Sequence, residues 1–463
     1  MDGSKKGHFA EQIRRFRARF VQSAGSALSE VLTPQVLKAL VQEEAGRWRE
    51  RLYSPLTTAM MFIEQVLGAD HSCQDAVAQG LSARISLGQT PSSLNTGPYC
   101  KARSRLALSL LERLAREVGG RLCMAQPAAW RWRGREVKLV DGTTVSMPDT
   151  VENQEAFPQS TQQKPGLGFP VARVVGIVSL SCGAVLEWAC GPCEGKNSGE
   201  TALLWDLLDK LSRGDVVVAD RYFAGYFGIA RMAQQGTDVV IRQHQRRHTD
   251  FRRGRRLGKR DHVVNWVRPQ RPRWMDQATY ATMPEFVVMR EVRVGNLTLV
   301  TTLLDDNEVG KLEVANLYGD RWQIELDFRS IKSVMQMDVL RCKRPEMVRK
   351  EIAVHLLAYN LVRIVMAQAA HLADVLPRQL SFKGTLQILN AFEQNLRFSP
   401  RARLGVRHEI VLAAIAQLLL PDRPDRSEPR AIKRRPTHQY LTKPRSVLRE
   451  QLQLQRRRHC RDG

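Results

Sequence analysis

Long apolar runs are missing from this sequence of 463 residues. A membrane-spanning helix needs about 18–20 consecutive apolar residues. The longest candidate, residues 352–376, is interrupted by His355, Asn360 and Arg363. The first 20 residues also lack the apolar core of a secretory signal peptide. These absences predict neither a membrane span nor secretion, and we expect a cytoplasmic protein.

Cysteine is sparse, and its eight residues include one close pair, Cys190 and Cys193 in the sequence CGPC. Scattered cysteines are typical of a reducing compartment. A redox dithiol places its first cysteine at a helix N-terminus, where its pKa falls. This pair instead follows GAVLEWA, which is typical of a strand. Because no second pair is present, a zinc site is disfavoured as well.

Positive charge is abundant, with a net charge of +24, and it is concentrated in two segments. Residues 242–273 contain twelve Lys/Arg and two Asp, a net of +10, and residues 422–463 contain thirteen Lys/Arg and five Asp/Glu, a net of +8. Localised basic segments on a moderately charged scaffold indicate phosphate binding and hence a nucleic-acid partner. Solvated loops and a disordered tail are the alternative, more so for the second segment.

The order of predicted elements indicates a mixed α/β fold. Hydrophobic composition is 43%, enough for a large core in a chain of this length. Helical periodicity dominates the first 130 residues, and from Glu136 onwards three strands precede an alternation of helix and strand. Ser198 is a plausible cap for the helix expected at residues 198–213. The segment after Pro421 is expected to be loosely ordered.

Two of the predicted strands end in an aspartate. Asp141 follows the run EVKLV, and Asp220 follows Val216–Ala219 in GDVVVADRYF. A buried carboxylate must be solvated, paired or bound to a metal. Two neighbouring carboxylates repel unless a divalent cation neutralises them. These strand ends therefore predict a metal site.

A third group of polar side chains lies in YGDRWQIELDFRSIK, residues 318–332. On a single helix, Tyr318, Arg321, Glu325 and Lys332 would share about 60° of arc. Without other functional residues in the sequence, such a stripe is explained by a solvated helix face with i,i+4 ion pairs. The two strand-end aspartates and the basic composition favour a functional stripe instead. Asp320 and Asp327 would face away from it, so the geometry selects Glu325 as the third carboxylate.

These residues resemble the insertion-sequence transposases of the IS4 family. The family shares a Tyr-x2-Arg-x3-Glu-x6-Lys signature, which Tyr318, Arg321, Glu325 and Lys332 match at every position. DGTT after the first strand, DRYF after the fourth and LRCKRPEMVRKEIAVHLLAYNLVR downstream are similar as well. The resemblance covers about residues 20–370 and implies a ribonuclease-H-like core.

The resemblance also implies a mechanism. Asp141, Asp220 and Glu325 would hold two Mg²⁺ ions, with Mn²⁺ as a substitute, for in-line phosphodiester displacement by water or a DNA 3′-hydroxyl. Arg321, Lys332 and Tyr318 would contact phosphates. Transposition would proceed by cut and paste, often through a DNA hairpin, on the terminal inverted repeats and a target duplex. A homodimer in a synaptic complex is implied, in a bacterial cytoplasm and associated with the nucleoid.

Three further residues are candidate DNA contacts. Arg221 follows Asp220 and either orients that carboxylate, contacts phosphate or forms a structural ion pair. Trp266 and Trp274 lie in the basic segment and are candidates to receive a flipped base. A structural role is the alternative for both tryptophans. Trp322, within the signature, is equally consistent with the core.

The fold expected from these features is a ribonuclease-H-like catalytic core with a β-rich insertion, a helical N-terminal domain and a helical C-terminal region. The N-terminal domain is a possible DNA contact or a plain packing domain. The predicted limits are 1–130 for the helical N-terminal domain, 131–242 for the first part of the core, 243–303 for the basic insertion, 304–370 for the rest of the core and 371–463 for the C-terminal region and tail.

Two other functions remain open at this stage. A hydrolytic DNA nuclease on the same core would use the same metals without strand transfer. A non-catalytic DNA-binding repressor, derived from a transposase, would be expected to lack at least one of the three carboxylates, and all three are present.

Overall fold

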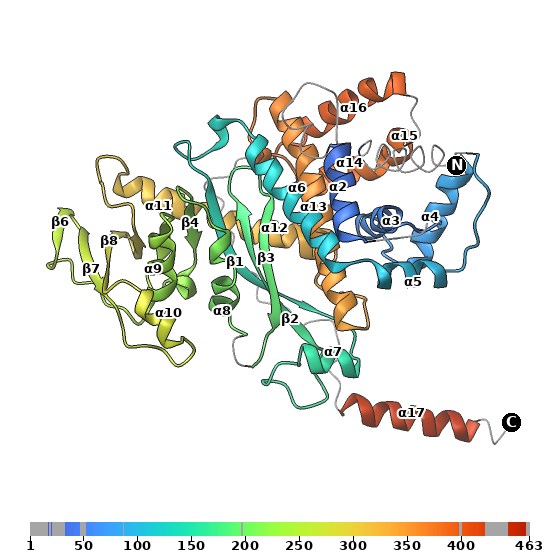
Figure 1. The fold of residues 1–463 in the computed structure, drawn as a ribbon, viewed down its shortest axis with the longest axis horizontal. Helices are drawn as coiled ribbons and strands as arrows, with labels where there is room; N and C mark the ends of the chain where they lie inside the picture. Colours follow the sequence, from blue (N-terminus) through green and yellow to red (C-terminus); the bar gives the residue numbers. More distant parts are fainter. Residues whose placement is uncertain are drawn as a thin grey trace.

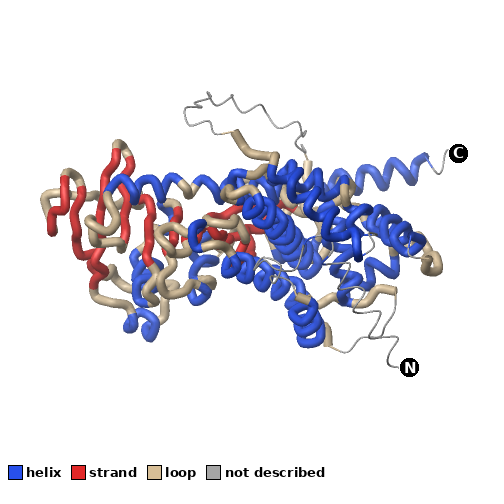
Figure 2. The backbone as a smooth tube through the Cα atoms, turned by 90° about the horizontal axis from the view of Figure 1, so that it is seen from above, coloured by secondary structure: helices blue, strands red, loops and turns tan. Residues whose placement is uncertain are grey.

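The computed structural model describes residues 17, 20, 33–46, 52–86, 88–195, 198–397, 401–421 and 443–459. The expectations for most of residues 1–32 and for residues 422–442 lie outside the described part. Figures 1 and 2 show strands gathered toward one end of the molecule and helices toward the other.

A single nine-stranded mixed sheet runs through the molecule in the order β3-β2-β1-β4-β5-β9-β8-β7-β6. Strands β1, β2 and β3 are antiparallel neighbours, whereas β4 and β5 run parallel to β1. Three antiparallel strands followed by two parallel ones in this order form a ribonuclease-H-like core. The strands of this core are β1 Val137–Ser146, β2 Val171–Ser179, β3 Val185–Pro192, β4 Val216–Ala219 and β5 Asp238–Arg242.

Strand β4 is buried on both faces, as its unbroken apolar run predicts. Val216 and Val218 belong to the hydrophobic cluster on one face of the sheet, and Val217 and Ala219 belong to the cluster on the other. Helices α6, α12 and α13 contribute to the first cluster, and α8 and α9 contribute to the second. The sheet is therefore the middle layer of three.

The basic segment after β5 extends the same sheet. It contributes β6 Arg255–Gly258, β7 Asp261–Val267, helix α10 Gln277–Thr282, β8 Phe286–Val294 and β9 Leu297–Thr301. Strand β9 returns beside β5, so the insertion continues the core sheet (Figure 1). The fold is thus a ribonuclease-H-like core with a β-rich insertion.

The remaining helices lie before, within and after this sheet. They are α2 Pro34–Glu44, α3 Pro55–Leu67, α4 Cys73–Ser86, α5 Gly97–Arg105, α6 Leu108–Ala125, α7 Val151–Ala156, α8 Glu200–Trp205, α9 Tyr226–Gln234, α11 Lys311–Gly319, α12 Trp322–Arg329, α13 Pro345–Leu372, α14 Phe382–Ala391, α15 Glu393–Arg397, α16 Arg401–Ala416 and α17 Arg445–His459.

The N-terminal helices share their core with the catalytic sheet. Leu37 of α2, Phe62 of α3 and Leu114 of α6 lie in the same buried cluster as β1 and α13. The arginines of α6 are engaged within the protein: Arg113 pairs with Glu43 and Glu44, and Arg116 pairs with Glu187. These contacts account for the packing of the region, while its predicted limits and its contact with DNA stay predictions.

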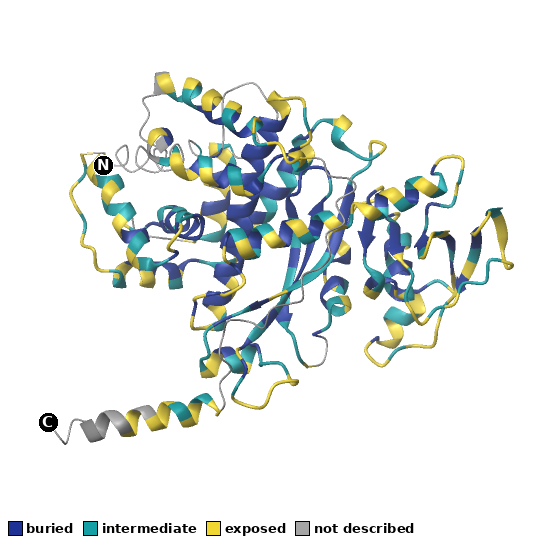
Figure 3. Ribbon diagram, turned by 180° about the vertical axis from the view of Figure 1, so that it is seen from behind, coloured by how far each residue is buried: buried dark blue, intermediate teal, exposed yellow. Residues whose placement is uncertain are grey.

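Helix α13 passes the length and composition criteria for a membrane span, yet it is buried inside the protein. Figure 3 shows it in the buried interior between the sheet and the outer helices. Its polar residues have partners there. Asn360 donates hydrogen bonds to Ala115 O and Val185 O and accepts one from Val185 N, which ties α6 to β3. Among the described residues, α13 is therefore the central core helix.

Local details differ from the expectations in three places. Strand β1 continues through Asp141 to Ser146, because it remains paired with β2 after its pairing with β4 ends. The expected helix at 198–213 is short: it begins after Gly199, and Ser198 donates its hydroxyl to Gly195 O rather than capping it. The expected loose tail contains α17, which extends from the body in Figure 1 and is held there by Arg445 against Asp149 and Phe169.

Candidate active site

The sheet places Asp141 and Asp220 side by side. Strands β1 and β4 are parallel and pair Val140 with Ala219, so the next residue on each strand is an aspartate. Asp141 accepts a hydrogen bond from Gly142 N at 2.8 Å, and Asp220 accepts one from Tyr222 N at 2.8 Å. The second bond caps the short 3₁₀ turn Arg221–Phe223 and fixes Asp220 at the strand end.

Helix α12 brings the third carboxylate to this sheet edge. Arg321, at its start, donates to Glu325 Oε1 at 2.6 Å and lies 3.4 Å from Asp141 Oδ2. The guanidinium of Arg321 thus joins the α12 carboxylate to the β1 carboxylate across a long sequence separation. Strand pairing thus places Asp141 beside Asp220, and Arg321 links Glu325 to Asp141.

The electrostatics of the cluster follow from burial and like charge. Burial raises the pKa of Asp141 to about 6, against the lowering effects of Gly142 N–H and Arg321, and the charges of Asp220 and Glu200 raise it further. A carboxylate in this setting is stabilised by any additional positive charge. An additional positive charge beside Asp141 would lower its pKa.

Of the other two signature residues, Tyr318 lies closer to the carboxylates than Lys332 does. Tyr318 is half-buried at the end of α11, where burial raises its pKa and the charges of Arg321, Arg242 and Asp220 act on it. The helix is not continuous as expected, since Asp320 and Arg321 form a turn between α11 and α12. Lys332 lies further on, in the π-helix Ser330–Val334, where burial lowers its pKa. No contact joins Lys332 to the three carboxylates among the described residues.

Arg221 points toward the insertion rather than toward Asp220. Its Nη1 donates to Gln245 Oε1 at 3.2 Å, in the loop after β5. That loop belongs to the basic segment, so Arg221 links the end of β4 to the insertion. It is half-buried and remains a candidate for a phosphate contact.

The two candidate tryptophans have opposite environments. Trp266 is only 3% exposed, donates its Nε1 proton to Glu291 at 2.8 Å and is covered by Arg247 at 3.6 Å. Trp274 is 56% exposed and lies at the rim of a cavity of about 700 Å³. Of these two tryptophans, Trp274 is the one with an exposed ring. Trp322 is also exposed, at 51%, rather than in the core.

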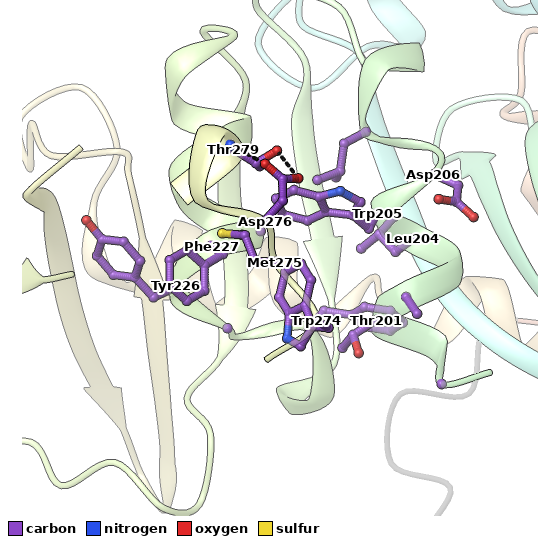
Figure 4. Close-up of a pocket in the computed structure, with 16 residues that line it drawn as sticks. Thr201, Leu204, Trp205, Asp206, Tyr226, Phe227, Trp274, Met275, Asp276 and Thr279 are labelled. Atoms are coloured by element: carbon purple, nitrogen blue, oxygen red, sulfur yellow. Dashed lines mark hydrogen bonds between the residues drawn. The ribbon is translucent and has the colours of Figure 1, made fainter. Parts of the chain in front are cut away.

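The cavity beside Trp274 is formed by α8, the residues after Asp220 and the insertion (Figure 4). Trp205 and Phe227 meet Trp274 edge to face, with ring centroids 5.2 and 6.1 Å away. Thr201 and Asp276 add polar groups to the wall. Because α8 also carries Glu200, the cavity adjoins the carboxylate cluster.

Three charged residues of the site were not identified from the sequence. Glu200 begins α8 and its charge acts on Asp141, Arg173 of β2 lies 3.8 Å from Glu200, and Arg242 ends β5 near Tyr318. Glu200 reads locally as an ordinary acidic residue in a first helical turn. Arg242 belongs to a long basic segment, and Arg173 is a single charged residue in an apolar strand. The sequence around these three residues therefore did not distinguish them as site residues.

The donor set fits a hard divalent cation. Carboxylate oxygens are the ligands that Mg²⁺ and Mn²⁺ prefer. Asp141 and Glu325 share Arg321, and Asp220 follows the strand that pairs with the strand of Asp141. No three acidic, histidine or cysteine side chains of the described residues are arranged around one point as a finished ligand set. Arg321 supplies the positive charge between Asp141 and Glu325 in this arrangement.

The thiols of the CGPC pair have raised pKa values, whereas a redox dithiol has a lowered one. Cys190 lies in β3, where burial raises its pKa to about 11, and burial raises the pKa of Cys193 as well. A reactive dithiol requires a lowered pKa.

Comparison with known proteins agrees with this geometry. Residues 132–361 match the family model "Transposase DDE domain". The transposase InsG of insertion sequence element IS4 from Escherichia coli K12 is 31% identical over 354 residues, which cover 74% of this chain and 77% of InsG. The chain belongs to the IS4 family of DDE transposases. It is therefore an enzyme of DNA transposition, of a class that cleaves DNA and transfers its strands with divalent metal ions.

Two further matches are more limited. The transposase of insertion sequence element IS421 from Escherichia coli is 43% identical over 68 residues, 15% of this chain and 18% of that protein. Among solved structures, a piggyBac transposase synaptic complex with hairpin DNA aligns with 90% of this chain and 87% of its own, at 10% identity and a TM-score of 0.41. Likeness at that level supports no argument about fold or function.

Proposed function

We propose that this transposase moves an insertion sequence by cut and paste, with Asp141, Asp220 and Glu325 holding two Mg²⁺ ions. The observation that carries the proposal is the pairing of Asp141 and Asp220 on adjacent parallel strands, with Glu325 joined to Asp141 through Arg321. When bound, the ions would activate the attacking oxygen and stabilise the leaving oxygen of a phosphodiester. Mn²⁺, with the same ligand preference, would substitute.

The chain's own residues have separate tasks in this proposal. The carboxylates orient around the cations, which relieve the repulsion between Asp141 and Asp220. Arg321 is then released from its role as the neutralising charge and can donate to a phosphate oxygen in a two-pronged contact. Tyr318 at the end of α11 and Lys332 in the π-helix after α12 would contact phosphates of the cleaved end, and Arg221 those beside the insertion.

The cavity at Trp274 supports a step in which a base leaves the duplex. A hairpin intermediate at the transposon end requires an unpaired base, and an exposed ring beside an aromatic-lined cavity offers it a stacking surface. Trp266 has a structural role instead, because its ring is buried and its N–H is bonded to Glu291. Of the two tryptophans, Trp274 is the proposed base receptor.

The proposed partners follow from the reaction. The DNA substrates are the terminal inverted repeats of the element and a target duplex, bound in a synaptic complex by a homodimer. The basic insertion lies next to the carboxylate cluster, at the end of β5, and would hold flanking phosphates. The proposed location is the bacterial cytoplasm, in association with nucleoid DNA.

Cleavage of a labelled duplex carrying the element's own ends tests the proposal. The wild type, Asp220→Asn and Glu325→Gln would be compared with Mg²⁺, with Mn²⁺ and with EDTA. We expect metal-dependent cutting at the end and its loss in both variants, with DNA binding retained. Undiminished cutting by either variant removes that residue from the site. Cutting without joining to a target duplex would favour the nuclease, and binding without cutting by the wild type would favour the repressor.

A further inference from the structure

Arg247, in the loop between β5 and β6, is a half-buried arginine that stacks on an aromatic ring. Its Cζ lies 3.6 Å from the centre of the Trp266 ring. Burial lowers the pKa of Arg247, against the charge of Glu291, and no hydrogen bond or ion pair reaches the guanidinium among the described residues. A cation that is partly withdrawn from water is unfavourable unless negative charge compensates it. The face of the indole supplies only part of that compensation.

Trp266 is a fixed platform, because each group around it is held by the next. Its Nε1 donates to Glu291 Oε1 at 2.8 Å, and Glu291 Oε2 lies 3.1 Å from His262 Nε2. His262 Nδ1 donates to the carbonyl oxygen of Arg253 at 2.7 Å, since a carbonyl can only accept. Trp266, His262 and Glu291 are all buried. Both oxygens of Glu291 therefore have other partners, and neither is bonded to Arg247.

Other arginines of the basic segment use their donors within the protein. Arg268 donates to the carbonyl oxygens of Tyr280 and Met283, and Arg271 donates to that of Met275. Arg247 differs from them, because within the described part of the chain its N–H groups are unused while the ring fixes its orientation. A stacked guanidinium keeps its N–H groups in its own plane, where they can donate in pairs to a phosphate.

The loop that carries Arg247 begins beside the proposed active site. Gln245 Oε1 accepts a hydrogen bond from Arg221, the residue directly after Asp220. Arg247 N then donates to His244 O at 2.9 Å and closes a turn over these residues. Arg247 is therefore one turn away from the contact that joins the loop to the end of β4.

We infer that Arg247 is a preformed receptor for a DNA backbone phosphate near the cleaved end and that Trp266 is its platform. The inference rests on the proposed contact between the insertion and flanking phosphates. The guanidinium would hold the phosphate through charge-assisted hydrogen bonds. Trp266, Glu291 and His262 are positioning residues, because they act on the phosphate only through Arg247.

The salt dependence of DNA binding tests this inference without cleavage. Fluorescence anisotropy of a labelled end duplex in EDTA would give Kd over a range of NaCl concentrations for the full chain, as wild type, Arg247→Gln and Arg213→Gln. The slope of log affinity against log salt changes by about 0.9 for each phosphate contact. Arg213 is the matched control, because it is an exposed arginine before β4, at the end of that strand opposite Asp220.

We expect Arg247→Gln to reduce the slope by about 0.9 and to weaken binding about tenfold. Arg213→Gln should keep the wild-type slope. Arg247→Lys keeps the charge but loses the planar fork, so it should restore the slope while binding stays about threefold weaker than that of the wild type. A wild-type slope in Arg247→Gln overturns the inference and leaves the metal site untouched, since EDTA removes the metal. Wild-type binding without any salt dependence instead refutes the underlying phosphate contacts of the insertion.

Combined variants test the platform. Trp266→Phe loses the hydrogen bond to Glu291 and part of the ring, so it should weaken DNA binding in the wild-type background. In the Arg247→Gln background it should change affinity by less than about twofold, because the receptor is already absent. An equal loss in both backgrounds overturns the role of Trp266. If urea unfolding shows that Trp266→Phe does not fold, Glu291→Gln takes its place in the same cycle, with the same expected and refuting outcomes.

Discussion

Replacement of Asp327 by asparagine should destabilise the protein and slow DNA cleavage, although Asp327 is not in the active site. Its side chain is 1% exposed on the face of α12 opposite Glu325. Asp327 Oδ1 accepts hydrogen bonds from Tyr359, Arg363 and Arg378, and Oδ2 accepts one from Arg378 at 3.0 Å. The residue therefore fixes the helix that carries Arg321 and Glu325 to α13 and to the turn after it.

The expected magnitude follows from the charges that would be left behind. The side chains of Arg363 and Arg378 are 6% and 10% exposed, so water cannot solvate them in place of the carboxylate. Removal of one partner from a buried ion pair costs about 3–5 kcal/mol. Since two guanidinium groups share this one carboxylate, we expect Asp327→Asn to fall at the upper end of that range.

Urea unfolding followed by circular dichroism measures the loss of stability, and Mg²⁺-dependent cleavage of the end duplex measures the effect on the site. A displacement of catalytic groups by about 1 Å can cost about 100-fold in rate, and we expect at least a tenfold loss with DNA binding retained. Glu313→Gln is the matched control, because Glu313 of α11 also pairs with an arginine, Arg133, but at the surface. Its expected cost is below about 1 kcal/mol.

The result that would refute this reasoning is a cost below about 1 kcal/mol for Asp327→Asn, equal to that of the surface control. The network would then contribute nothing measurable to the position of α12. A large loss of stability with an unchanged cleavage rate would refute the positioning role alone.

Other predictions concern pH and the two tryptophans. The Asp141 carboxylate must lose its proton to bind a cation, and its pKa lies near 6, so Mn²⁺ affinity should fall about fivefold from pH 6 to pH 5; a flat titration would contradict this. Folding responds to pH in the opposite direction, because the raised pKa means that folded Asp141 binds its proton more tightly than unfolded Asp141. The contribution of Asp141 to the free energy of unfolding should therefore decrease as pH rises from about 4 to 6, which urea titrations with and without Asp141→Asn would measure. Trp274→Ala should change stability by less than about 1 kcal/mol and reduce hairpin formation on the end duplex. Trp266→Ala should cost about 3–5 kcal/mol in unfolding experiments, since a buried ring and its hydrogen bond to Glu291 are lost.

Several features of the fold could be predicted because they depend on neighbours in the sequence. The apolar run of β4 predicts a strand covered on both faces, as the structure has it. Two strand patterns and one helical spacing selected the three carboxylates. The strands place Asp141 beside Asp220 and Arg321 joins Glu325 to Asp141, while the metal-binding role of the three stays a prediction. Local patterns of this kind follow from backbone sterics and from which face of an element is apolar.

Other features depend on residues that meet only after folding. Strand β1 continues past Asp141 because β2 remains beside it, and no residue near Asp141 specifies that pairing. Trp266 and Trp274 have similar sequence surroundings, yet Trp266 is buried in a hydrophobic cluster of the sheet and bonded to Glu291, whereas Trp274 is exposed. The residues around a side chain in the sequence do not specify which distant segment will cover it in the fold.

The sequence by itself therefore determined the class of the protein and the order of its main elements, because motif spacing and polarity along short stretches specify them, and it predicted the three acidic residues. The tertiary structure alone decided that Arg247 covers Trp266, that Asp327 anchors α12 and that Arg321 joins two of the carboxylates. These contacts combine segments tens to hundreds of residues apart. Their energies depend on burial and distance, which exist only in the folded chain.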